Sequence, residues 1–177
     1  MTPQTALLMS RYNRWMNQAV YEAARTLPGQ EVTRDRGAFF GSILQTLNHI
    51  AAADLIWLHR FAQHPAATAL RAALAGWPAP TSLRQPMAPS LEALEKQRQA
   101  LDEVIDQWVH TFSPELLADT LSYRNMAGEV HAKHLGSLVQ HFFNHQTHHR
   151  GQASTLLFQA GVDVGVTDLL AMIPDAA

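Results

Sequence analysis

Histidine is concentrated in one short segment of the chain. Six of the ten histidines fall within 19 residues: His131, His134, His141, His145, His148 and His149. On an α-helix, residues four apart differ by about 40° in direction and about 6 Å in rise, so two imidazoles at that spacing can share one metal ion. His145 and His149 have this spacing, as do His141 and His145, and His148 lies three residues after His145. Spacing alone leaves two interpretations open, a metal site or separate histidines on a solvated helix face.

A metal site needs at least three protein donors, and two histidines of one helix supply only two. In a helix bundle the third donor must come from a facing helix. We identify His49 as the candidate, since no lysine or arginine is close in sequence and Ala52 and Ala53 leave room for an ion. The alternative is a histidine at the edge of the core that bonds a carbonyl or water. Three nitrogen donors suit Zn²⁺, Ni²⁺, Cu²⁺ or Fe²⁺ and leave positions open for water or substrate, as catalytic sites do.

Two further histidines are candidates for roles around the site. His148 points about 100° away from His149, so it is expected on the solvated face or in contact with a ligand side chain. His141 precedes His145 by one turn and is expected to line a pocket. His141 is not expected to bind the same metal ion as His145 and His149, because it lies about 12 Å along the helix axis from His149.

Polar side chains near the histidines are weighed in the same way. Asn144 and Gln152 could donate hydrogen bonds into the pocket, or they could be surface amides. Asp54 lies about 140° around the helix from His49, which excludes it as a ligand on the same face but lets it bond the second nitrogen of another histidine. Arg150 would be repelled by a cation, so we expect it to point outward.

Four amphipathic segments must position these groups. Apolar residues recur at spacings of three and four over residues 5–27, 36–61, 91–112 and 134–160, which is typical of helices with one buried stripe. Ser90 is a plausible cap of the third segment and Gly161 of the fourth. The expected class is therefore an all-α four-helix bundle in a single domain, residues 1–177.

The connections between the segments are unequal in length. Residues 64–89 hold five of the nine prolines, which predicts a long crossover after the second helix, with one or two helical turns in residues 66–74. Residues 120–133 carry apolar side chains around Ala127 and Gly128, which favours a short hairpin or an irregular excursion before the last helix.

Composition excludes several classes of function. The chain has 177 residues, of which 47% are apolar, and 13 Lys and Arg against 15 Asp and Glu. The resulting net charge of −2 argues against nucleic-acid binding. Cysteine is absent, so disulfides, thiolate zinc sites and cysteine nucleophiles are excluded. Residues 1–11 lack the features of a signal peptide, and no apolar run reaches the roughly 20 residues of a membrane span, so a cytoplasmic protein with no membrane partner is expected.

The block from Asn144 to Gln152, with its H-x-x-x-H-R-G-Q pattern, resembles the DinB/YfiT-like family of metalloproteins, as do His49, Asp54 and Trp57 of the second segment. The resemblance implies that His49, His145 and His149 hold the metal. It also implies an up-down-down-up bundle, a frequent homodimer and, in members of known chemistry, the use of a low-molecular-weight thiol. Those members include mycothiol-dependent maleylpyruvate isomerase and bacillithiol S-transferases.

We therefore expect a metal-dependent enzyme with a small-molecule substrate. Its ion would activate a low-molecular-weight thiol, for S-transfer or isomerisation, or a water, for hydrolysis. Zinc and nickel are expected first, with iron, copper and manganese as alternatives. Hydrolysis is disfavoured because no glutamate accompanies the histidines as in H-E-x-x-H enzymes. The remaining alternative is a non-catalytic metal-binding stress-response protein, whose structural zinc would need His141 or His148 as a fourth ligand.

A homodimer is also expected from composition. The second segment carries apolar residues over much of its circumference, beyond what one bundle core is expected to enclose: Phe39, Phe40, Ile43, Leu47, Ile50, Ile56 and Trp57.

Overall fold

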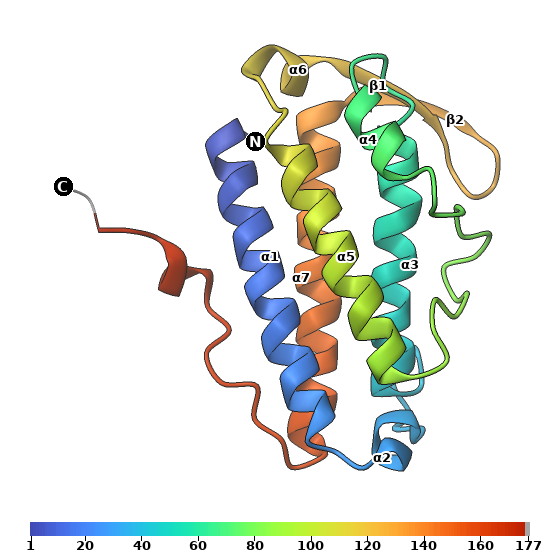
Figure 1. The fold of residues 1–177 in the computed structure, drawn as a ribbon, viewed down its shortest axis with the longest axis vertical. Helices are drawn as coiled ribbons and strands as arrows, with labels where there is room; N and C mark the ends of the chain where they lie inside the picture. Colours follow the sequence, from blue (N-terminus) through green and yellow to red (C-terminus); the bar gives the residue numbers. More distant parts are fainter. Residues whose placement is uncertain (176–177) are drawn as a thin grey trace.

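Four long helices dominate the computed structural model, which describes residues 1–175. They are α1 (Pro3–Arg25), α3 (Ile43–Phe61), α5 (Leu91–Val109) and α7 (Leu135–Gln159). Figure 1 shows them side by side, with α1 and α7 running in one direction and α3 and α5 in the other. Helix α7 packs against both α3 and α1, and α5 packs against α1 and α3. None of the helices in the described residues is long and apolar enough to cross a membrane.

Short polar side chains begin three of these helices. Thr2, Ser42 and Ser90 each accept a hydrogen bond from the backbone N–H three residues later, which satisfies a donor that the first helical turn leaves free. Gly161, just beyond α7, has a φ of 87°, the left-handed conformation that glycine adopts most readily after a helix. The predicted caps at Ser90 and Gly161 are confirmed.

The second long helix begins later than the sequence predicted. The apolar spacing predicts a helix from residue 36, but α3 starts at Ile43. Gly37 and Gly41 adopt φ values of 67° and 84°, so the intervening chain turns before Ser42 caps the helix. Phe40, which the apolar spacing assigns to this helix, instead lies in the turn and packs against His49 of α3.

The connections contain short helices and one hairpin. The predicted helical turn in the crossover is α4 (Thr68–Ala73). Strands β1 (Thr120–Arg124) and β2 (Val130–His134) pair antiparallel, so the all-α class is corrected to a mostly helical fold with a small two-stranded sheet. Leu121 and Tyr123 are buried while their neighbours are exposed, the alternation of a strand with one covered face. The remaining short elements are α2 (Gly29–Thr33), α6 (Pro114–Ala118) and the 3₁₀ helix η1 (Leu169–Met172).

The core between the long helices holds charged groups as well as apolar ones. Arg98 of α5 is buried and donates to Asp54 of α3, and it lies 3.0 Å from Asp102. The Asp102 carboxylate also accepts hydrogen bonds from the amide of Asn17, at 2.9 and 3.2 Å. Arg150 of α7 is buried as well and donates to Asn13, which in turn donates to Asp102 at 3.2 Å.

Candidate metal centre

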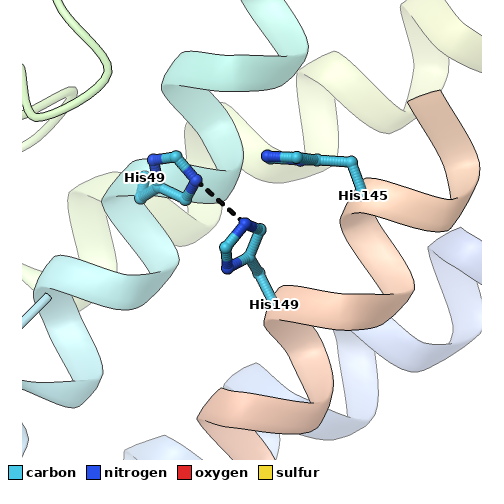
Figure 2. A group of neighbouring side chains, drawn as sticks. All are labelled: His49, His145 and His149. Carbon is cyan, nitrogen blue, oxygen red and sulfur yellow. Dashed lines mark hydrogen bonds between the residues drawn. The ribbon is translucent and has the colours of Figure 1, made fainter. Parts of the chain in front are cut away.

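Three histidines from two facing helices meet on one side of this core. His49 projects from α3, and His145 and His149 project from successive turns of α7 (Figure 2). One ring nitrogen from each lies within 4.8 Å of the other two. Helices α3 and α7 pack directly against each other, so the group is held by the main packing of the molecule.

The outer hydrogen bonds of two of these rings fix where their protons lie. His49 Nδ1 is 2.9 Å from the carbonyl oxygen of Leu83, and His149 Nδ1 is 2.8 Å from Gln152 Oε1. Both oxygens can only accept, so both Nδ1 atoms carry hydrogen and donate. In the neutral rings each Nε2 atom then carries a lone pair. These two Nε2 atoms lie 3.2 Å apart, the contact drawn in Figure 2. With the protons placed in this way neither neutral ring can donate to the other, so the two lone pairs are arranged to share a metal ion or an additional proton.

The donor set fits a transition-metal ion. Two donors at about 2.0–2.1 Å from a tetrahedral ion are about 3.3–3.4 Å apart, close to the 3.2 Å between the His49 and His149 Nε2 atoms. The His145 ring lies 4.4 Å from that of His149 and 5.2 Å from that of His49, between centroids. Within residues 1–175 it makes no side-chain hydrogen bond that would occupy its nitrogens. Three imidazoles without a thiolate suit zinc, nickel, copper or iron.

Burial keeps all three imidazoles neutral. It lowers the pKa of His145 to about 3, helped by the neighbouring imidazoles of His149 and His49. The pKa of His49 is also lowered, by burial first and then by His149 and Arg84, against the opposing effect of the hydrogen bond to Leu83. Burial likewise lowers the pKa of His149. Neutral imidazole is the form that binds metal, so the site is prepared for an ion.

These shifts set the pH dependence of metal stabilisation. The unfolded chain binds protons near pH 6.5, whereas the folded histidines resist them, so the metal-free protein loses stability as the pH falls below that value. For the same reason protons compete with the metal only at lower pH. With zinc at 100 times its dissociation constant, the gain of about 2.7 kcal/mol should be seen at pH 7.5 and retained at pH 6.0. Thermal melts with and without zinc measure it, and loss of the gain between these two pH values would contradict the shifted pKa values.

The two remaining candidate histidines lie beside the group. His148 is exposed, and its Nε2 lies 3.3 Å from the side-chain nitrogen of Gln152. His141 packs edge-on against Trp57, and its ring centroid is 6.1 Å from that of His145. Neither belongs to the group of close donors found among the described residues.

The structure decides between the alternatives for Asn144 and Asp54 and corrects the prediction for Arg150. Asn144 is exposed and lines a separate groove between α1 and α7, with Met1 and Thr5. Asp54 does not bond a histidine, because its position around α3 turns it toward α5, where it pairs with Arg98. The outward orientation predicted for Arg150 is wrong, since it is buried and reaches Asn13.

Two contributors to the site were missed by the sequence analysis. The Leu83 carbonyl is a backbone group in the crossover, which no pattern of side chains could indicate. Phe40 stacks on His49 with 3.9 Å between ring centroids and 19° between the planes, and its ring lies 5.5 Å from that of His149. The apolar spacing of the sequence predicts Phe40 as part of the helix, not as a residue that packs on it.

Gln152 offers a direct test of the outer hydrogen bonds. Gln152→Ala removes the acceptor that orients His149, and metal affinity should fall about 10- to 100-fold, as when other partners of ligand histidines are removed. Asn144→Ala, on the same helix but without a bond to the group, should leave affinity unchanged. Competition with a chromophoric chelator measures both, and equal affinities of the Gln152 variant and the wild type would show that the bond does not orient the ring.

The comparisons with known proteins all match this chain over most of its length. A model of the DinB family matches residues 1–175. Protein DinB of Bacillus subtilis (strain 168) is 27% identical over 163 residues, which are 92% of this chain and 90% of that protein. The crystal structure of a DinB-like protein from Bacillus cereus ATCC 10987 covers 85% of this chain and 89% of its own, with a TM-score of 0.50 and 18% identity. At that identity the likeness concerns the fold.

Proposed function

The chain belongs to the DinB family, and from this premise we propose that it is a metal-dependent enzyme that activates a low-molecular-weight thiol. His49, His145 and His149 would hold the divalent ion, with zinc or nickel preferred and iron, copper or manganese as alternatives. The observation that carries the proposal is the convergence of three neutral imidazoles without a fourth donor among the described residues. A site with three protein ligands keeps a position open for a reactant.

The side chains around the ion have separate tasks in this proposal. Leu83 and Gln152 hold protons at Nδ1 of His49 and His149, so that both Nε2 lone pairs face the ion. Phe40 covers one face of the His49 ring and excludes water there. A bound divalent ion supplies the charge that deprotonates a coordinating thiol.

The absence of a nearby carboxylate favours a thiol over water as the activated group. Among residues 1–175, no aspartate or glutamate belongs to the group or hydrogen-bonds one of its three histidines. A metal hydrolase of the H-E-x-x-H type uses such a carboxylate as general base. A non-catalytic site closed by a fourth histidine is less well supported, because His141 packs on Trp57 and His148 contacts Gln152.

The order of helix directions in the bundle is part of the same proposal. We take the four long helices as the up-down-down-up bundle that the family resemblance implies. The directions of α1, α3, α5 and α7 in Figure 1 support this order.

We also propose a homodimer, on a different basis from the sequence argument. A single chain buries five of the seven apolar residues that suggested it: Phe40, Ile43, Leu47, Ile50 and Ile56. Phe39, Phe158 and Leu170 remain more than 70% exposed and would gain cover from a second copy. Sedimentation velocity at micromolar concentration should therefore show a species of twice the chain mass, and a monomer would contradict the proposal.

The experiment that tests the proposed activity is a thiol-dependence screen. Protein without a histidine tag is analysed for metal and then assayed with a panel of electrophiles and mycothiol, bacillithiol or glutathione. Turnover that needs both the metal and one thiol, and that is lost in His149→Ala, is the expected result. Turnover without thiol would favour a hydrolase, and stoichiometric metal without any turnover would favour a non-catalytic protein.

A further inference from the structure

A cavity of about 270 Å³ lies against His49, on the side where the crossover meets α3. Its lining combines an aromatic ring, a proline, two amides, an imidazole and a guanidinium: Phe40, Gln45, Asn48, His49, Arg84 and Pro86. No acidic side chain lines it. A volume slightly below the usual range for ligand sites suits a small molecule.

Arg84 is held at this cavity by the same loop that orients His49. It directly follows Leu83, whose carbonyl accepts the bond from His49 Nδ1. Its guanidinium carbon lies 5.0 Å from the centroid of the Phe39 ring and 5.5 Å from that of Phe40. The loop itself is fixed to α3, because Asn48 Oδ1 accepts the backbone N–H groups of Met87 and Ala88 at 2.6 and 3.0 Å.

Arg84 is exposed, and most of the hydrogen-bond donors of its guanidinium have no protein partner in the part of the chain that the structure describes and are open to solvent or a ligand. Its one side-chain hydrogen bond within residues 1–175 runs from Nη2 to the Phe39 carbonyl, at 3.3 Å. A guanidinium has five N–H donors, so four lack a protein partner there. No carboxylate of the described residues lies within ion-pair distance of Arg84, which differs in this from Arg36 and Arg98 but not from Arg60 or Arg150.

The one charged side chain of the cavity lining is positive, which favours an anion. Arg84 is positive, His49 is neutral, and Gln45 and Asn48 lie in the first two turns of α3, near the positive end of the helix dipole. The planar fork of an arginine matches the two oxygens of a carboxylate better than it matches a single neutral acceptor. The Phe40 ring offers an apolar surface for the remainder of such a ligand.

We propose that Arg84 binds the carboxylate of a small organic acid in this cavity, with the rest of the acid directed toward the three-histidine group. The acid belongs either to the thiol or to its electrophilic co-substrate, and the carboxylate is the chemistry common to both. The direction toward the histidines rests on the proposed function, whereas recognition by Arg84 does not.

Two pairs of probes test the assignment on metal-loaded protein. Benzoate is compared with neutral benzamide, and 3-mercaptopropionate with neutral 2-mercaptoethanol, by calorimetric or ligand-detected NMR titration. In the wild type at least one acid should bind more tightly than its neutral analogue. Arg84→Gln should weaken that acid about 10- to 100-fold, the range expected for hydrogen bonds to a charged group, and leave the neutral analogue unchanged. Which acid responds tells whether the carboxylate belongs to the thiol or to the co-substrate.

A matched control and the metal-free protein keep the result interpretable. Arg11→Gln, at an exposed arginine of α1, should leave the affinities for both acids unchanged. Metal content measured on every variant tests the proposed function separately, and the titrations repeated without metal test Arg84 even if no metal binds. Equal affinity of the acids for the Arg84 variant and the wild type, or no preference for either acid over its neutral analogue, would overturn the proposal.

Discussion

Replacing His149 with alanine is expected to abolish stoichiometric binding of a divalent metal, with a loss of affinity above the roughly 100-fold that removal of an outer hydrogen-bond partner can cause. The variant removes one of three donors and also the ring whose Nε2 lies 3.2 Å from that of His49. Two imidazoles then remain, His49 and His145, and neither a structural nor a catalytic zinc site is built on so few protein ligands. Competition against a chromophoric chelator measures the loss.

His148→Ala is the matched control, because it removes the neighbouring imidazole of the same helix. His148 is exposed and contacts Gln152 without joining the close group. Its variant should retain most of the affinity. Thermal melts of the metal-free variants show whether both proteins fold, and equal losses of affinity from two folded variants would mean that the ligand pair is wrongly assigned.

Replacing Arg98 with alanine should lower the free energy of unfolding by about 3–5 kcal/mol, the cost of breaking a buried ion pair by removing one partner. The Arg98 side chain is 2% exposed, and its partners Asp54 and Asp102 are 1% and 4% exposed. Without the guanidinium, the buried carboxylates of Asp54 and Asp102 lose the cation that lies between α3 and α5. Urea denaturation monitored by circular dichroism measures the change.

The control is an ion pair of the same helix that faces solvent. Lys96 and Glu92 of α5 lie 2.8 Å apart, with side chains 74% and 79% exposed. Solvent screens such a pair, so Lys96→Ala should leave the denaturation midpoint unchanged within error. A similar small effect of Arg98→Ala would mean that the buried cluster contributes little to the stability of the fold.

Much of the fold followed from the apolar spacing of the sequence. Three of the four long helices begin and end within about three residues of the predicted limits, because their buried stripes coincide with caps such as Ser90 and Gly161. The start of α3 was misplaced because Phe39 and Phe40 continue the apolar spacing into a turn formed at Gly37 and Gly41. Apolar periodicity cannot distinguish a helical residue from one that folds back onto the helix.

The site was predictable where it depends on helix geometry and not where it depends on loops. The spacing of His145 and His149 follows from the helical repeat. His49 was a candidate from its sequence surroundings, and the resemblance to DinB proteins, now confirmed as family membership, favoured it as a ligand over a histidine at the edge of the core. Arg84 and the Leu83 carbonyl reach the site through the crossover, whose path no local pattern determines. Arg150 was expected to point outward because a bound cation would repel it, but the side chain instead turns into the core, where it joins a buried polar cluster around Asp102.

The most direct test of the three-histidine metal site is anomalous X-ray diffraction at a metal absorption edge, from crystals of zinc-loaded protein without a histidine tag. We predict one dominant peak bonded to His49, His145 and His149 at about 2.0–2.1 Å from each ring nitrogen, with a further position open to solvent. No peak at these histidines, or a peak that includes His141 or His148 as a fourth protein ligand, would contradict an open catalytic site.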